Sequence, residues 1–239
     1  MVERKEALFD KLATVYDDWY KTPLGSFADK VEGDLIFKHL KEISKKKLLD
    51  VGCGTGLYSM RASIAGANVS GIDISEKMLE IAEKKAKMLS LPINFTYGDM
   101  ENLPFAENTF DIVHSVTALE ISKNPLKTLK EIHKVLKPKG KAVIGVLSAI
   151  SIWAKKRKEK AKKTNSVYVY THFFKPQELS SLMAKAGFRS IVAESSLFVP
   201  PNDEAKLPKF AYLQEFLGKF FTPLRGAFLA VTGVKIETY

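Results

Sequence analysis

Residues 48–56 read Leu-Leu-Asp-Val-Gly-Cys-Gly-Thr-Gly and form the strongest local signal in the chain. An apolar strand pattern runs into a turn with glycines at alternate positions, and a helical pattern begins directly after it. Glycine tolerates positive φ and lets backbone N–H groups approach a ligand, so this pattern predicts a ligand-binding turn. A dinucleotide fingerprint would need its third glycine where Leu57 or Ser59 stands. We therefore do not expect a nicotinamide cofactor.

Apolar runs alternate with helical patterns along the rest of the chain. Strands separated by helices of this length form βαβ units on a mostly parallel sheet, so we predict one α/β domain over residues 1–239. The expected strands cover 47–51, 68–72, 93–97, 110–116, 142–147, 189–198 and 227–236. The expected helices cover 8–20, 27–43, 57–65, 76–89, 125–136 and 176–186.

Two carboxylates follow the next two strands. Asp73 ends the strand that begins at residue 68, and Asp99 comes just after the strand at 93–97. Because the carboxyl ends of parallel strands meet at one edge of a sheet, both side chains should lie beside the glycine turn. A carboxylate about 20 residues after such a turn can accept two hydrogen bonds from ribose hydroxyls. These residues are therefore candidates for binding a ribose and a nucleobase.

The glycine turn and the two carboxylates resemble those of the class I S-adenosylmethionine-dependent methyltransferases, and most nearly the ubiquinone and menaquinone biosynthesis branch. Further matching motifs follow in order within about residues 8–195: Leu103-Pro104-Phe105, 108–113, 131–138 and Ala186-Gly187-Phe188. The resemblance implies a three-layer, Rossmann-like fold with a seven-stranded, mostly parallel sheet whose last strand is antiparallel. It also implies S-adenosylmethionine as the cofactor.

The same resemblance assigns roles to individual residues. The glycine turn would border the methionine part of the cofactor, with Asp50 near its amino group. Asp73 would hold the ribose, and Asp99 would accept a hydrogen bond from the adenine amino group. The whole predicted cofactor site consists of Tyr16, Asp50, Gly52, Cys53, Gly54, Gly56, Asp73, Ile74, Met78, Asp99, Met100, Ser115 and Val116. Carboxylates suit this ligand, because it is cationic and carries no phosphate.

Methyl transfer from a sulfonium depends on a positioned acceptor and on excluding water, so a dedicated base is optional. Tyr20, Glu120 and His172 are candidates for polar contact with the acceptor. The Asn/Asp-Pro-Pro-Tyr motif of planar-amine methylation is absent after residue 116, which disfavours a planar amino group as the acceptor. The single thiol, Cys53, lies within the glycine turn, which disfavours a mechanism that needs a cysteine nucleophile, such as cytosine C5 methylation. No metal site is predicted, because the four histidines lack ligand spacing.

The chain is strongly basic, with 37 lysines and arginines against 27 acidic residues and a net charge of +10. Seven basic residues and one acidic residue lie within 155–163, so most of the excess is local. We expect an acidic partner, which the composition leaves open as an anionic small molecule, a membrane surface or RNA. One cysteine excludes an intrachain disulfide, and no uncharged stretch reaches the length of a transmembrane helix, so we expect a cytoplasmic protein.

Three segments are expected to cover the substrate side. They are an N-terminal helical lid over 1–43 and insertions over 150–175 and 200–224. The apolar residues between 207 and 221 suit closure of the pocket, a homodimer contact or a peripheral membrane contact. We predict a methyltransferase for a small-molecule or lipid-like acceptor, with the basic run favouring an anionic one. An RNA methyltransferase and a catalytically silent S-adenosylmethionine-binding regulator are the alternatives.

Overall fold

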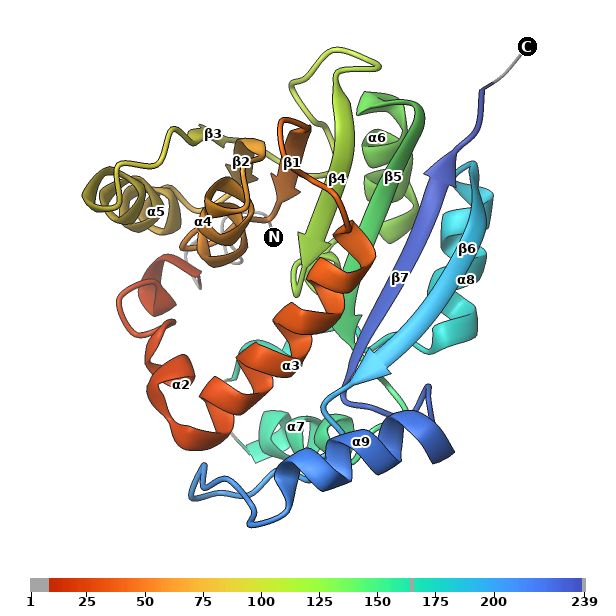
Figure 1. The fold of residues 1–239 in the computed structure, drawn as a ribbon. Helices are drawn as coiled ribbons and strands as arrows, with labels where there is room; N and C mark the ends of the chain where they lie inside the picture. Colours follow the sequence, from red (N-terminus) through yellow and green to blue (C-terminus); the bar gives the residue numbers. More distant parts are fainter. Residues whose placement is uncertain (1–8, 164–165, 238–239) are drawn as a thin grey trace.

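The computed structural model describes residues 9–163 and 166–237, and these contain a seven-stranded sheet (Figure 1). The strands lie in the order β3-β2-β1-β4-β5-β7-β6. Neighbours pair in parallel from β3 to β5, whereas β7 lies antiparallel between β5 and β6. The strands are β1 (Lys47–Val51), β2 (Asn68–Asp73), β3 (Asn94–Tyr97), β4 (Phe110–Val116), β5 (Leu136–Leu147), β6 (Phe188–Ser196) and β7 (Phe228–Lys235). The predicted sheet, mostly parallel with an antiparallel last strand, is confirmed.

Helices cover both faces of the sheet, which gives the three layers. Successive residues of a strand point to opposite faces, so Leu48 packs with α3 and α4 while Leu49 packs with α6 and α8. Figure 1 shows α3 in front of the sheet and α6 and α8 behind it. The α-helices are α2 (Asp18–Lys21), α3 (Pro23–Leu40), α4 (Leu57–Ile64), α5 (Glu76–Met88), α6 (Pro125–Val135), α7 (Ile152–Lys163), α8 (Pro176–Lys185) and α9 (Ala211–Phe221).

A third hydrophobic cluster lies beyond the sheet, at the edge where β5 ends. It joins the start of α3 to α7 and α9 through residues that include Phe27, Trp153 and Ala211. The Trp153 indole Nε1–H also donates to the Val199 carbonyl at 2.7 Å, which fixes α7 to the segment before α9. The two insertions expected on the substrate side therefore pack together at one end of the domain (Figure 1).

The N-terminal helices differ from the prediction. Helical residues 9–12 are followed by turns over 13–17, so the expected helix over 8–20 is interrupted, and Leu8 lies outside the described residues. α3 begins at Pro23 rather than at 27 because Thr22 caps it: its Oγ1 accepts from the Gly25 N–H at 3.0 Å. β5 starts at Leu136 rather than at 142, because Leu136 already pairs with Phe110 before a register shift.

The basic run at 155–163 is helical and forms most of α7. Residues 164 and 165 of the first insertion and residues 1–8 of the expected lid lie outside the described part of the chain. Within that part, no helix is both long enough and apolar enough to cross a membrane.

Candidate functional site

The glycine turn between β1 and α4 is held against the end of β2. The N–H groups of Gly52 and Cys53 both donate to the Ile72 carbonyl, at 2.8 and 3.0 Å. Gly52 has a φ of +73°, and a Cβ at this position would lie 2.3 Å from the Cβ of Ala118. Gly54 has a φ of +53°, and a Cβ there would meet nothing within 4 Å. Packing therefore requires Gly52 to be glycine, whereas the space beside Gly54 can admit a ligand.

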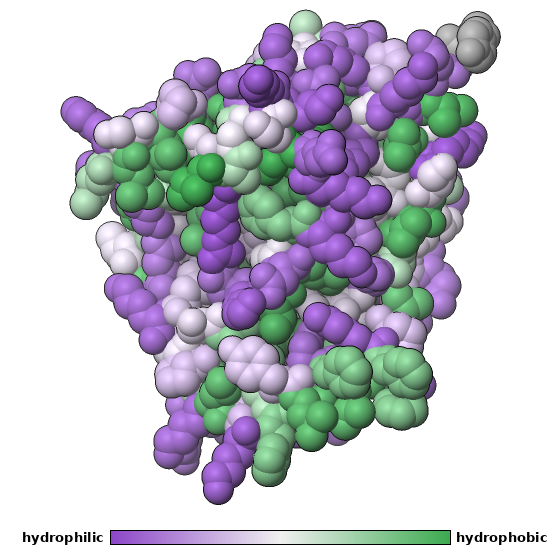
Figure 2. Space-filling view, viewed as in Figure 1, coloured by the Kyte–Doolittle hydropathy of each residue, from purple (hydrophilic) through white to green (hydrophobic). Residues whose placement is uncertain are grey.

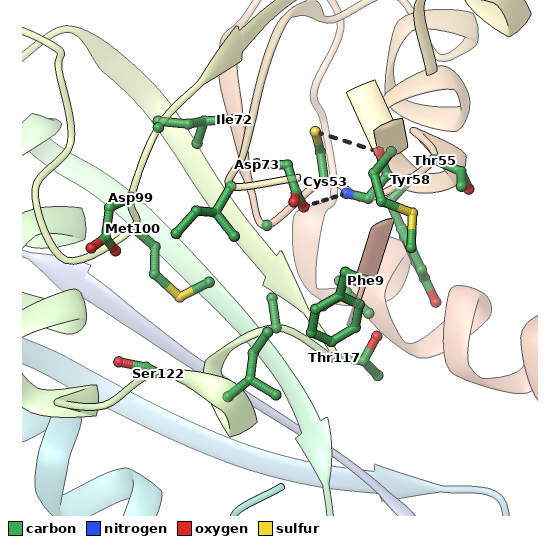
Figure 3. Close-up of a pocket in the computed structure, with 18 of the residues that line it drawn as sticks. Phe9, Cys53, Thr55, Tyr58, Ile72, Asp73, Asp99, Met100, Thr117 and Ser122 are labelled. Carbon is green, nitrogen blue, oxygen red and sulfur yellow. Dashed lines mark hydrogen bonds between the residues drawn. The ribbon is translucent and has the colours of Figure 1, made fainter. Parts of the chain in front are cut away.

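Asp73, at the end of β2, connects the glycine turn to the cap of α5. Its Oδ2 accepts from the Gly54 N–H at 2.8 Å and its Oδ1 accepts from the Ser75 N–H at 2.9 Å. Burial raises the pKa of this carboxyl, and hydrogen bonds from backbone N–H groups, those of Ser75 and Gly54 foremost, oppose the rise. A carboxylate has about four acceptor positions, so about two remain for the hydroxyl groups of a ligand. Figure 3 shows Asp73 in the wall of a pocket.

The pocket opens between the glycine turn and the loops that follow β3 and β4. Asp99 and Met100 lie on the side away from Cys53 and Tyr58, with Asp73 between the two groups (Figure 3). Asp99 Oδ1 accepts from the Glu101 N–H at 2.9 Å. The predicted cofactor residues that line the pocket are Tyr16, Gly52, Cys53, Gly54, Asp73, Ile74, Met78, Asp99, Met100 and Val116.

Three residues of the predicted cofactor site are not part of this lining. Asp50 lies on the α4 face of β1, where its Oδ2 accepts from Ser59 Oγ at 2.6 Å. Its Oδ1 lies 3.0 Å from Nε2 of His114, and all three side chains are buried. Ser115 donates its hydroxyl to the Val51 carbonyl at 2.8 Å, and Gly56 packs against α5. The structure thus places these residues behind the walls of the pocket.

Other lining residues were not anticipated from the sequence. Most of them adjoin a predicted residue in the chain, so the shared sheet edge was a sufficient signal for them. Phe9 and Tyr58 have no such signal, because only the folding of the N-terminal segment and α4 brings them to the pocket. The unanticipated residues are Phe9, Thr55, Leu57, Tyr58, Ile72, Gly98, Glu101, Thr117, Ala118, Ile121, Ser122 and Lys123.

The described residues that precede α3, 9–22, form an N-terminal segment that lies across one side of the pocket. Asp17 accepts from the Thr55 hydroxyl at 2.8 Å and also pairs with Lys85 of α5. Asp10 accepts from the hydroxyl of Ser75, the N-cap of α5, at 2.6 Å. These contacts attach the segment to the same turn and helix cap that position Asp73.

Aromatic side chains form the part of the pocket under this segment. The rings of Tyr16 and Tyr20 meet edge to face with centroids 6.3 Å apart, and Tyr16 hydrogen-bonds to Thr117. Phe9 and Thr117 also line the pocket, and both are labelled in Figure 3. Burial raises the pKa of both tyrosines, so their hydroxyls stay protonated and can donate hydrogen bonds without acting as bases at neutral pH. Tyr20, Glu120 and His172 were the candidates for contact with the acceptor and hence for catalysis, and of these three only Tyr20 lines this pocket.

The other two catalytic candidates lie outside the pocket lining. Glu120 is 2% exposed, and its Oε1 accepts from the Leu147 N–H at 2.7 Å. Its Oε2 is buried without a hydrogen-bond partner in the described structure, and burial raises its pKa to about 7. His172 is half exposed, with Nε2 2.6 Å from Glu178 Oε1. Among the described residues, no three metal-ligating side chains converge.

Comparisons with known proteins agree on one family. Residues 49–144 match a family described as a methyltransferase domain. An uncharacterised protein of Methanocaldococcus jannaschii is 30% identical over 96% of this chain and 99% of its own length. Demethylmenaquinone methyltransferase of Staphylococcus saprophyticus is 40% identical, but the match covers 45% of this chain and 47% of that protein. A Thermotoga maritima structure, described as an S-adenosylmethionine-dependent methyltransferase and possible histamine N-methyltransferase, aligns over 96% of this chain and 99% of its own. Its TM-score is 0.76 at 24% identity, which supports the fold.

Proposed function

The chain belongs to the class I S-adenosylmethionine-dependent methyltransferases, and from this we propose that it methylates a small, lipid-like acceptor bound beneath the N-terminal segment. S-adenosylmethionine is its cofactor. The observation that carries the acceptor proposal is the aromatic lining that Phe9, Tyr16 and Tyr20 give to this part of the pocket.

The residues of the pocket fit the cofactor. Asp73 keeps about two acceptor positions for the ribose hydroxyls after its bonds to the glycine turn and the α5 cap. We assign Asp99 and Met100 to the adenine, and the open space beside Gly54 to the methionine part. The carboxylates also favour the positive charge of a sulfonium ligand over an anionic nucleotide.

The chain's own residues then act by orientation and by excluding water. When bound, S-adenosylmethionine supplies an electrophilic methyl group for in-line displacement by the acceptor, and the sulfonium sulfur becomes a neutral thioether, the leaving group. The N-terminal segment shields the reacting atoms from water through its contacts with Thr55, Lys85 and Ser75. Protonated Tyr20 can orient a polar group of the acceptor, which holds its nucleophilic atom in line with the methyl group.

A small acceptor is favoured over RNA by where the charge lies. Among the described residues, the pocket lining contains one basic residue, Lys123, and three acidic ones, Asp73, Asp99 and Glu101. The basic helix α7 contributes nothing to the lining. A phosphate backbone needs cations along its path, whereas the aromatic wall suits an apolar or aromatic molecule.

Transfer of labelled methyl groups tests this proposal. The protein is incubated with S-adenosylmethionine carrying an isotopic methyl label and with separated lipid, small-molecule, RNA and protein fractions of an extract. We expect label in the lipid or small-molecule fraction, and less of it with Asp73→Asn when the cofactor is below saturation. Label incorporated only into RNA or protein would overturn the proposed acceptor class.

A further inference from the structure

Helix α9 faces the domain with its small and charged side chains and faces outward with its large apolar ones. Its buried residues are Ala211 and Glu215, and Gly218 packs directly against the ring of Phe198. Phe210, which caps the helix, and Phe216 are each 67% exposed, and Phe220 is 75% exposed. This arrangement is the reverse of an ordinary amphipathic helix on a protein surface.

A buried carboxylate fixes this orientation. Glu215 is 5% exposed, and it accepts hydrogen bonds from the N–H groups of Leu197 at 3.2 Å and Phe198 at 2.9 Å, just after β6. Lys219 lies 3.2 Å from the same side chain. Rotating α9 to bury its apolar face would remove Glu215 from these donors and leave them unpaired, so the outward orientation is built into the fold.

The exposed side chains form one continuous strip. Phe210, Leu213, Phe216, Leu217, Phe220 and Phe221 recur at helical spacing and span about 140° of the circumference of the helix. Figure 2 shows hydrophobic side chains gathered at the lower end of the molecule, where α9 lies in Figure 1, with hydrophilic side chains beside them. Single exposed apolar residues are common, but a strip of this size indicates a binding surface.

The neighbouring helix α7 supplies the positive charge beside this strip. Lys156 of α7 donates to the Pro201 carbonyl at 3.1 Å, in the segment that leads to α9. Arg157 turns inward, over the ring of Trp153 at 4.8 Å. The exposed basic residues of α7 are therefore all lysines: Lys155, Lys156, Lys158, Lys160, Lys162 and Lys163.

We propose that α9 and α7 together form a docking face for the surface of an anionic lipid bilayer. The phenylalanines and leucines of α9 would lie among the upper acyl chains, while the α7 lysines contact the acidic headgroups. Charge complementarity favours this partner over a second copy of the chain, because two such faces would bring two lysine-rich helices together. The face lies at the end of the sheet where β5 terminates. There, α7 follows β5 and α9 precedes β7, and the start of β7 pairs with the end of β5 through Phe228 and Leu147.

Vesicle binding tests the proposal without depending on methyl transfer. The full chain is mixed with vesicles of phosphatidylglycerol and phosphatidylcholine, or of phosphatidylcholine alone, and binding is measured by flotation. We expect binding to the anionic vesicles, weakened between about 0.1 M and 0.5 M salt because headgroup contacts are screened. Phe216→Asp with Phe220→Asp should lower the partition coefficient at least about tenfold.

A matched control separates the apolar strip from added charge and from misfolding. Ile64 and Met88 are 68% and 84% exposed on α4 and α5, away from α9, so Ile64→Asp with Met88→Asp adds the same charge. This control should bind vesicles like the natural chain, and both double variants should keep their affinity for S-adenosylmethionine. Absence of vesicle binding by the natural chain would overturn the proposal. So would a dimer in sedimentation equilibrium that the α9 variant abolishes while vesicle binding is unchanged.

Discussion

Replacing Asp73 by asparagine tests the assignment of the cofactor site most directly. The carboxylate uses one oxygen for the Gly54 N–H and the other for the Ser75 N–H, each at 2.9 Å or less. Asparagine keeps one acceptor oxygen and turns the other position into an NH₂ donor. One of the two N–H groups would then face a donor, and at least one ribose hydroxyl would lose a charged acceptor.

The expected loss of cofactor affinity follows from these bonds. A hydrogen bond to a charged group contributes about 1.5 to 3 kcal/mol, and part of the ribose interaction survives on the remaining oxygen. We therefore expect Asp73→Asn to weaken S-adenosylmethionine binding by about 2 kcal/mol, which is about 30-fold in Kd. Asp73→Ala, which removes both oxygens, should bind no better than the asparagine variant.

Isothermal titration calorimetry measures the affinity, and a second variant controls for general loss of stability. Asp111 in β4 also accepts from a backbone N–H, that of Lys47 at 2.8 Å, and pairs with Lys137 outside the pocket lining. Asp111→Asn should therefore lower the free energy of unfolding while leaving the Kd unchanged. An unchanged Kd for a folded Asp73→Asn variant would refute the ribose assignment.

Three further predictions concern the turn, a buried carboxyl and the N-terminal segment. Gly52→Ala should lower the free energy of unfolding by about 1 to 3 kcal/mol in denaturant titration, because its Cβ would meet that of Ala118 at 2.3 Å and φ is positive. Burial raises the pKa of Glu120 from 4.5 to about 7, so the folded chain binds this proton more tightly and loses on the order of 3 kcal/mol of stability as the pH rises between these values. Glu120→Gln should remove that loss, and equal pH dependence of unfolding in both proteins would contradict the prediction. Asp17→Asn should weaken the contacts with Thr55 and α5 and speed amide hydrogen exchange over the described part of the N-terminal segment, with little change in global stability.

The sequence was most informative where chemistry is local. The alternating glycines and the carboxylate that follows the next strand predict a ligand-binding site, and the structure brings them into one pocket because β/α alternation places the ends of parallel strands together. It was less informative about which side of an element a residue faces. Asp50 lies in the most diagnostic motif of the chain, yet strand alternation turns its carboxylate toward Ser59 and His114.

The orientation of the apolar face of α9 likewise depended on tertiary structure. From the sequence, the apolar residues between 207 and 221 suited closure of the pocket, a homodimer contact or a peripheral membrane contact, because periodicity shows that a helix has an apolar face but not where that face points. In the structure, the carboxylate of Glu215 finds two backbone donors after β6, and Gly218 allows close approach to Phe198. The sequence by itself therefore determined the fold class, the cofactor and the residues at the sheet edge. Only the tertiary structure decided that α9 presents its phenylalanines outward, since that choice rests on hydrogen bonds between segments that are separate along the chain.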